Sequence, residues 1–283
     1  MKKIIISLSL IMAVLLLSSC SSITEVDEDK VKNVSDKITE AIIDSVGKEK
    51  AERQESHTIS AGNLDTLNIK SSVGSINIST HDSKDAIINL NIAAQTGSMD
   101  KSQKLVDEFN YSVEENLNAI KIDTSFTDLK LDDTNLSTDL SITVPNNIEN
   151  IVINLNVGDI QIKNINGSYV IENNVGEIQV EGSKASYEIK TNVGEIILSE
   201  AVAVGNSDFV TNTGDIKVNF IDITEADSIE ASTDVGDIEL NVPDDSSYEA
   251  LINEFMEKER TETKNNEHTK IKIETGVGNI DFN

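Results

Sequence analysis

Apolar residues two positions apart recur around a short glycine-containing phrase that occurs seven times in the chain. The phrase reads Asn-Val-Gly-Asp-Ile at Asn156–Ile160 and Asn-Val-Gly-Glu-Ile at Asn174–Ile178 and Asn192–Ile196. Seven of the 14 glycines occupy its central position: Gly74, Gly158, Gly176, Gly194, Gly214, Gly236 and Gly278. A period of about 20 residues is typical of stacked repeats, in which each unit buries its apolar face against its neighbours.

Four columns of the repeat are mostly apolar and rich in β-branched residues. Counted from the glycine, they stand at positions −5, −1, +2 and +4, and position +2 is Ile in every copy. Such alternation predicts strands with one inward face. The interval from −1 to +2 is three residues, so the glycine is expected to turn a corner, because glycine adopts positive φ at little cost. The four columns are therefore expected in the core.

The repeat thus predicts an all-β protein, a parallel β-solenoid or β-helix of glycine-cornered coils. Two polar columns accompany it. Position −2 is expected to form an amide ladder along the stack, and its inner copies are Asn156, Asn174, Asn192, Asn212 and Asp234. Position +1 is acidic in the five inner copies, Asp159, Glu177, Glu195, Asp215 and Asp237.

The solenoid domain is expected to span residues 57–283. Residues 57–150 would hold the first coil and an antiparallel cap sheet, with a short helix at Asp100–Phe109 and a hairpin around Glu115–Asn118. Residues 151–242 hold the main repeats. Residues 243–283 would hold a helical insertion at Ser246–Arg260 and the last coil, because Tyr248, Leu251 and Ile252 follow helical spacing. Such covers protect the open ends of a stack from pairing with other chains.

The first residues have the pattern of a secretion signal. Two lysines precede an apolar run, which is short for a membrane span. Leu17-Ser18-Ser19-Cys20 closes the run and resembles the bacterial lipobox. That resemblance implies that residues 1–19 are a lipoprotein signal peptide and that Cys20 carries the lipid, such as palmitate. Residues 20–56 are charged and are expected to form a partly helical tether.

Charge narrows the class of partners. The chain has 50 acidic and 23 basic residues, a formal net charge of −27. Nucleic acids and anionic lipid surfaces should repel it. The expected partners are the membrane, through the N-terminal lipid, and either an envelope polymer or a membrane protein; the oligomeric state stays open.

The acidic column poses a separate question. Neighbouring coils lie about 4.8 Å apart, so five stacked carboxylates would repel one another. Solvation, hydrogen bonds to N–H groups at the corner, or a weakly bound cation such as calcium would relieve this repulsion. The first two are favoured, because the chain has no EF-hand loop or calcium-type nonapeptide repeat.

No pattern in the chain predicts catalysis. His57, His81 and His268 lie outside the regular repeat, and no nucleophile elbow, zinc-protease motif or phosphate-binding loop is present. We therefore expect no enzyme activity, no cofactor and no dedicated metal site. Carboxylate chemistry of the kind found in pectinase-like β-helices is the alternative that the fold leaves open.

The repeated Val-Gly-Asp-Ile and Val-Gly-Glu-Ile corners, a strand ending in Val144-Pro145 and a last corner near Asn283 resemble the bacterial putative-adhesin family of β-helix domains. The resemblance covers about Ser56–Asn283. It implies a membrane-anchored or secreted protein at the cell surface, with a binding or scaffold role.

The chain also resembles the anchored accessory proteins encoded beside envelope-stress sensors in Gram-positive bacteria. This second resemblance implies a regulatory role through a membrane partner, contacted by residues 21–56 or by the expected helix at Ser246–Arg260. Two functions are therefore in competition: an adhesin-like, non-catalytic binding scaffold, and a membrane-anchored accessory of a stress-sensing system.

Overall fold

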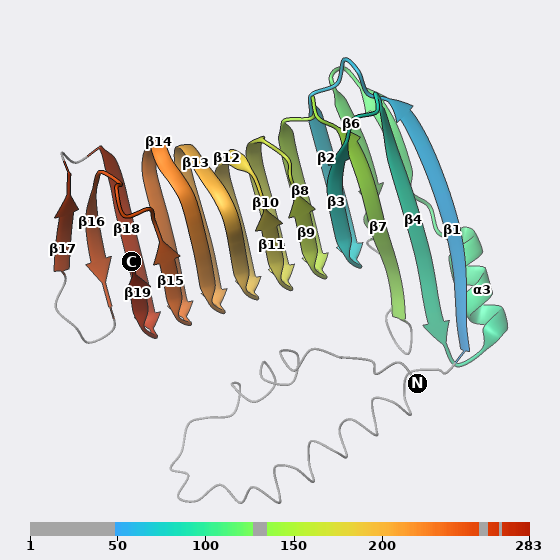
Figure 1. The fold of residues 1–283 in the computed structure, drawn as a ribbon. Helices are drawn as coiled ribbons and strands as arrows, with labels where there is room; N and C mark the ends of the chain where they lie inside the picture. The colour runs from blue at the N-terminus through green and yellow to red at the C-terminus, as the bar shows by residue number, and fades with distance from the viewer. Residues whose placement is uncertain (1–48, 127–134, 255–259, 266–267) are drawn as a thin grey trace, which may run out of the picture.

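The computed structural model describes residues 49–126, 135–254, 260–265 and 268–283. In these ranges the chain forms one hydrogen-bonded system of 19 strands, together with the helix α3 (Met99–Glu108). Figure 1 shows the strands as a row of bent ribbons that lie side by side. The all-β prediction is confirmed, and most strand pairs are parallel, as the repeat predicted.

Each repeat contributes one strand before its glycine and one after it. The strands before the glycine are β2 (Thr66–Val73), β8 (Asn150–Val157), β10 (Gly167–Val175), β12 (Lys184–Val193), the second halves of β13 (Ile196–Thr213) and β14 (Ile216–Val235), and β18 (Thr269–Val277). The strands after it are β3 (Ile76–His81), β9 (Ile160–Lys163), β11 (Ile178–Glu181), the first halves of β13 and β14, β15 (Ile238–Asn241) and β19 (Ile280–Phe282).

The coils stack in register. Val175 pairs with Val157 on one side and Val193 on the other, and Ile178 pairs in the same way with Ile160 and Ile196. Each column of the sequence repeat therefore becomes a straight row of side chains along the stack, because parallel pairing keeps equivalent residues next to each other.

Further strands extend the stack at the N-terminal side, the first of each layer paired in parallel and the next ones antiparallel. On the sheet before the corners, β6 (Ala119–Thr124) pairs with β2, and β5 (Ser112–Asn116) follows it. On the other sheet, β7 (Asn135–Pro145) pairs with β3, then β4 (Asp85–Thr96) and β1 (Glu49–Ser60) follow. The expected antiparallel strands, hairpin and short helix are present there.

The expected helix at Ser246–Arg260 is wrong for the part that is described. Residues Tyr248–Asn253 form the strand β16, which pairs in parallel with β18 and antiparallel with β17 (Arg260–Lys264). Tyr248, Ala250 and Ile252 alternate inward along this strand. Apolar residues at 248 and 252 fit both a helix and a strand, and pairing with the exposed edge of β18 decides in favour of the strand.

The tether is shorter than predicted. Strand β1 starts at Glu49 and pairs with β4 along its whole length, so residues 49–56 belong to the folded sheet. The boundary expected at 56/57 therefore falls inside a strand. The signal peptide at 1–19, Cys20 and the remainder of the tether lie outside the described residues.

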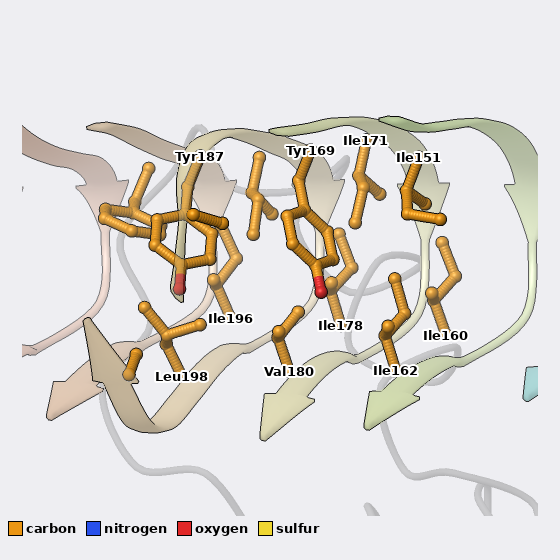
Figure 2. Close-up of a cluster of buried hydrophobic side chains, with 14 of the residues drawn as sticks. Ile151, Ile160, Ile162, Tyr169, Ile171, Ile178, Val180, Tyr187, Ile196 and Leu198 are labelled. Carbon is orange, nitrogen blue, oxygen red and sulfur yellow. The ribbon is translucent and has the colours of Figure 1, made fainter. Parts of the chain in front are cut away.

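The bend at the corners divides the strands into two facing sheets, one before the glycines and one after them. The core lies between these two sheets, where their side chains meet (Figure 2). The columns at −5 and +2 are buried in every repeat, and +4 is buried in all but the last, at Phe282. The prediction that the valines at −1 lie in the core is wrong, because Val157, Val235 and Val277 are 40%, 48% and 49% exposed. The corner spans four outward residues, −2 to +1, and the inward alternation ends at −3.

Candidate functional site

The glycine corners bring neighbouring coils into backbone contact. Gly176 has φ +138°, and a Cβ built there would lie 2.0 Å from the carbonyl oxygen of Gly158. The Gly158 N–H donates to the Val175 carbonyl at 2.9 Å. Gly158, Gly194, Gly214, Gly236 and Gly278 repeat this geometry. The corner therefore excludes any side chain, which is a stricter requirement than the positive φ that the sequence indicated.

Buried polar side chains at position −3 bond to these corners from inside. The hydroxyls of Thr211, Thr233 and Thr275 donate to the glycine carbonyls of Gly194, Gly214 and Gly236, at 3.1, 3.1 and 2.9 Å. The sequence analysis did not single out this column, because it listed only the mostly apolar columns as core. The recurrence of threonine at this position in the last four repeats, as Thr191, Thr211, Thr233 and Thr275, was the available signal.

The amide ladder at position −2 is confirmed. Each asparagine side chain donates to the carbonyl oxygen of the previous one, at 3.1 Å from Asn174 to Asn156, 2.8 Å from Asn192 to Asn174, and 3.1 Å from Asn212 to Asn192. The ladder is exposed, so it forms a continuous polar line along the corner edge of the stack.

The acidic column at +1 is also a continuous row, which we call the carboxylate row (Asp159, Glu177, Glu195, Asp215 and Asp237). Asp159 accepts the backbone N–H of Glu177 at 2.9 Å, and Asp215 accepts that of Asp237 at 2.9 Å. Hydrogen bonding to N–H groups at the corner, one of the three outcomes expected for the column, is therefore present. Asp139, from β7, extends the row by accepting the Ser75 N–H at 2.9 Å. It was missed because its coil has no glycine phrase.

The middle of the carboxylate row is electrostatically crowded. Partial burial raises the pKa of Glu177, and the neighbouring Glu195 and Asp159 raise it further, while Lys217 lowers it. Lys217 forms an ion pair with Glu195. No three His, Cys, Asp or Glu side chains among the described residues are arranged to hold a metal ion. Weak cation binding by the row therefore stays a prediction.

An open groove of about 730 Å³ crosses the outer face of strands β10, β12, β13 and β14; it lies near the N-terminal ends of β10 and β12 and in the interior of β13 and β14. Its outward side chains come from equivalent positions of successive coils and are almost all polar: Ser168, Val170, Ser186, Glu188, Asn206, Asp208, Ser228 and Glu230. Lys190 lies beside the groove and pairs with Glu188 at 2.8 Å and Asp208 at 3.5 Å. The sequence analysis did not single out this surface.

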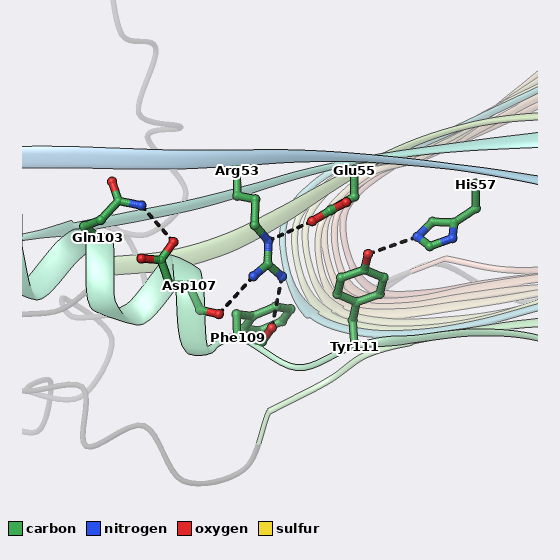
Figure 3. Close-up of polar contacts among 7 residues, drawn as sticks. All are labelled: Arg53, Glu55, His57, Gln103, Asp107, Phe109 and Tyr111. Carbon is green, nitrogen blue, oxygen red and sulfur yellow. Dashed lines mark hydrogen bonds and ion pairs between the residues drawn. The ribbon is translucent and has the colours of Figure 1, made fainter.

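A second polar cluster lies between β1 and the end of α3 (Figure 3). The Arg53 guanidinium donates to the carbonyls of Asp107 and Phe109, at 3.1 and 3.0 Å, and forms an ion pair with Glu55 at 3.2 Å. His57 Nε2 lies 3.0 Å from the Tyr111 hydroxyl. These contacts fasten the helix to the sheet, since they satisfy carbonyls that a helix C-terminus leaves free.

The repeated corner, the in-register ladders and the extended N-terminal side together define a recognisable fold. Residues 58–283 match the family described as Toastrack DUF4097. The chain belongs to the Toastrack DUF4097 family. The match begins inside β1 and continues to the last residue of the sequence, so it covers all the glycine corners.

The comparison with solved structures also finds similar chains. One is a "putative cell adhesion protein" from Clostridium sporogenes, 14% identical, covering 82% of this chain and 99% of that chain with a TM-score of 0.34. Another is a "putative adhesin" from Bacteroides fragilis, 17% identical, covering 84% and 98% with a TM-score of 0.43. Comparison with curated proteins gives no match.

Among the residues that the structure describes in this Toastrack chain, no helix is both long and apolar enough to cross a membrane.

The carboxylate row of the Toastrack stack gives a prediction about salts. We expect millimolar calcium chloride to raise the melting temperature only as much as sodium chloride of the same ionic strength, because both screen repulsion between the carboxylates. The row offers carboxylates alone, without the loop carbonyls that complete a calcium site. Melting curves of the chain from Ser21 onward measure this; a larger shift in calcium would show a specific site.

Proposed function

We propose that the chain is a surface-exposed, lipid-anchored lipoprotein of the bacterial envelope that acts as a non-catalytic binding scaffold of the adhesin-like kind. In this proposal the stacked coils form a rigid β-solenoid, and an extracytoplasmic envelope polymer binds across its strands. The proposal needs no cofactor and no nucleic acid.

The groove over β10 to β14 is the observation that carries the proposal. Its polar side chains stand on paired strands of a continuous sheet, so their spacing is fixed before a ligand arrives, and binding then costs little conformational entropy. Hydroxyl, amide and carboxylate groups recur from coil to coil. A linear polymer with repeated hydroxyl or ammonium groups would meet the same chemistry at each coil.

The chemistry of the described residues favours binding over catalysis. His57 and His81 both have hydrogen-bond partners in the N-terminal extension, the Tyr111 hydroxyl at 3.0 Å and the Asp85 carbonyl at 2.7 Å. Neither lies against the groove. The groove carboxylate Glu188 and its neighbour Asp208 are both paired with Lys190, which suits binding better than proton transfer.

Lipid attachment at Cys20 is expected to depend on that single thiol. Cells grown with labelled palmitate should incorporate the label into the wild-type chain and not into Cys20→Ala, because Cys20 is the only cysteine in the sequence. Ser19→Ala serves as the matched control and should keep the label, since small residues suit a lipoprotein cleavage site. Equal labelling of the wild type and Cys20→Ala would refute the anchor.

Photo-crosslinking in intact cells tests the groove. A photoreactive phenylalanine analogue at Glu188, in the groove, should capture polymeric envelope material. The same analogue at Gln179, which pairs with Gln161 on the outer face of the other sheet, is the matched control and should not.

Two results would overturn the binding-scaffold proposal. Identical adducts at both positions would show that the groove is not the site. Capture of a membrane kinase or transporter at Glu188 would instead support the regulatory function, in which the chain is an accessory of an envelope-stress sensor.

A further inference from the structure

The valines at position −1 form a line of exposed and half-buried apolar side chains along the corner edge. We call it the valine row: Val73, Val157, Val175, Val193, Thr213, Val235 and Val277. Each member pairs with the next along the stack. At about 4.8 Å per coil the row is about 29 Å long. Three of its valines are at least 40% exposed, and they account for three of the seven large hydrophobic side chains that are exposed among the described residues.

Core packing does not explain this apolar row. Valine stays at −1 although the bend turns the position outward, and the neighbouring columns at −2 and +1 are polar in the inner coils. Thr213 shows that a β-branched polar residue fits the same position in the same stack. No valine of the row is fully buried, and apolar side chains that stay open to solvent between polar borders are typical of an interaction site.

The charge beside the valine row defines the chemistry of a partner. Only the glycine separates each valine from the carboxylate row, and one member of that row, Glu177, lies between two like charges. Lysine or arginine side chains placed there would relieve the repulsion and gain charge-assisted hydrogen bonds. A second copy of this chain, with a net charge of −27, would instead add to the repulsion, and so would an anionic lipid surface.

We propose that the valine row docks a basic amphipathic helix of a partner protein, laid along the stack. Its apolar side chains would cover the valines, and its lysine or arginine side chains would face the carboxylate row. The spacing favours a helix, because side chains on one face of a helix recur about every 5.4 Å, close to the 4.8 Å of the coils, whereas those of a strand recur about every 6.7 Å. A helix of about 20 residues would span the row.

This docking site is separate from the polymer-binding groove. The valine row lies at the C-terminal ends of strands β10 and β12, whereas the groove lies near their N-terminal ends. Failure of one proposal therefore leaves the other standing, and substitutions at the two surfaces distinguish them.

The test uses the chain from Ser21 onward, which holds the whole hydrogen-bonded sheet, and a synthetic helical peptide of about 18 residues as the probe. The peptide carries leucine at positions i, i+3, i+4 and i+7 and lysine along one flank. Its scrambled version has the same charge without the apolar face. Titration calorimetry at two salt concentrations should show binding of the amphipathic peptide about tenfold tighter than binding of the scrambled one.

Substitutions that keep the strand geometry then locate the site. Val157→Thr, Val175→Thr and Val193→Thr together should weaken binding by about tenfold, because they remove apolar contact and place threonine where Thr213 already shows that it fits. Val152→Thr, Val202→Thr and Val210→Thr together are the matched control and should bind as the wild type. All three are half-buried at outward positions of β8 and β13, away from the corners, and none of them lines the groove.

A charge variant completes the test. Asp159→Asn, Glu177→Gln and Glu195→Gln together should weaken binding and flatten its salt dependence. Melting curves check that each variant is folded. The proposal is overturned if the valine-row variant binds as tightly as the wild type, if the control variant loses binding equally, or if the scrambled peptide binds as well as the amphipathic one.

Discussion

Replacing Gly176 with alanine is expected to destabilise the fold by more than about 3 kcal/mol, enough to leave a marginally stable domain largely unfolded. The new Cβ would lie 2.0 Å from the Gly158 carbonyl oxygen, and both backbones are held in place by hydrogen bonds between the coils. The substitution also forces a residue with a side chain into φ +138°. Chemical denaturation of the purified variant measures the loss.

Two other glycines separate these causes. Gly62→Ala should be nearly neutral, because nothing lies within 4 Å of an added Cβ and its φ is ordinary. Gly205→Ala has equal space but a φ of +63°. It should therefore lower the free energy of unfolding only by the strain of an alanine at positive φ, about 1 kcal/mol. If Gly176→Ala were no worse than Gly205→Ala, the backbone contact at the corner would not be what requires glycine.

Replacing Ile178 with aspartate should unfold the domain, with a loss of more than about 4 kcal/mol. Ile178 is fully buried between the two sheets and stacks on Ile160 and Ile196 of the neighbouring coils. The carboxylate would be buried without a partner, and the apolar contacts on both sides would be lost. Circular dichroism and one-dimensional NMR spectra should show an unfolded chain.

The same substitution at Ile221 is the matched control. Ile221 is 58% exposed, so Ile221→Asp keeps the new charge in water and should change stability by less than about 1 kcal/mol. A folded Ile178→Asp variant, or an Ile221→Asp variant destabilised to the same degree, would contradict the burial of the +2 column.

The parallel stack could be predicted from sequence because its units repeat at the same interval. Identical residues at Ile160, Ile178 and Ile196 must occupy equivalent places if the coils stack, so a single reading of the period gives the strands, their direction and their register. The amide ladder followed for the same reason. A side chain that recurs once per coil is repeated every few ångströms along the stack.

The direction of side chains at the corner could not be predicted, because alternation breaks down where a strand bends. Val157 was expected inside and is exposed, whereas Thr211, for which no direction was predicted, is buried and bonds to a glycine carbonyl. Binary patterning assigns a side to a residue only while the strand is straight. The groove was missed for a related reason: its polar residues lie on the solvent face, where polarity is expected and carries no signal.

The parts outside the repeat were predicted less well, since each depends on a pairing partner distant in sequence. Strand β1 at Glu49–Ser60 looks like a continuation of the charged tether, and only β4 makes it a strand. Asp139 joins the carboxylate row through a coil whose neighbour, Ser75, lies 64 residues earlier. Neither relation leaves a local pattern in the sequence.

The stack has a further property that follows from its glycine contacts. Gly194 lies on Gly176, and Gly176 lies on Gly158, and in both pairs a Cβ added to the glycine would lie about 2 Å from the carbonyl oxygen below it. Removing the 18 residues between two equivalent positions would therefore bring Gly194 onto Gly158, with Asn192 next to Asn156 and Ile196 next to Ile160. The number of coils is a free variable of this architecture, and duplication or loss of one unit changes its length in steps of about 4.8 Å. Such a change in length keeps the glycine contact between each pair of neighbouring coils.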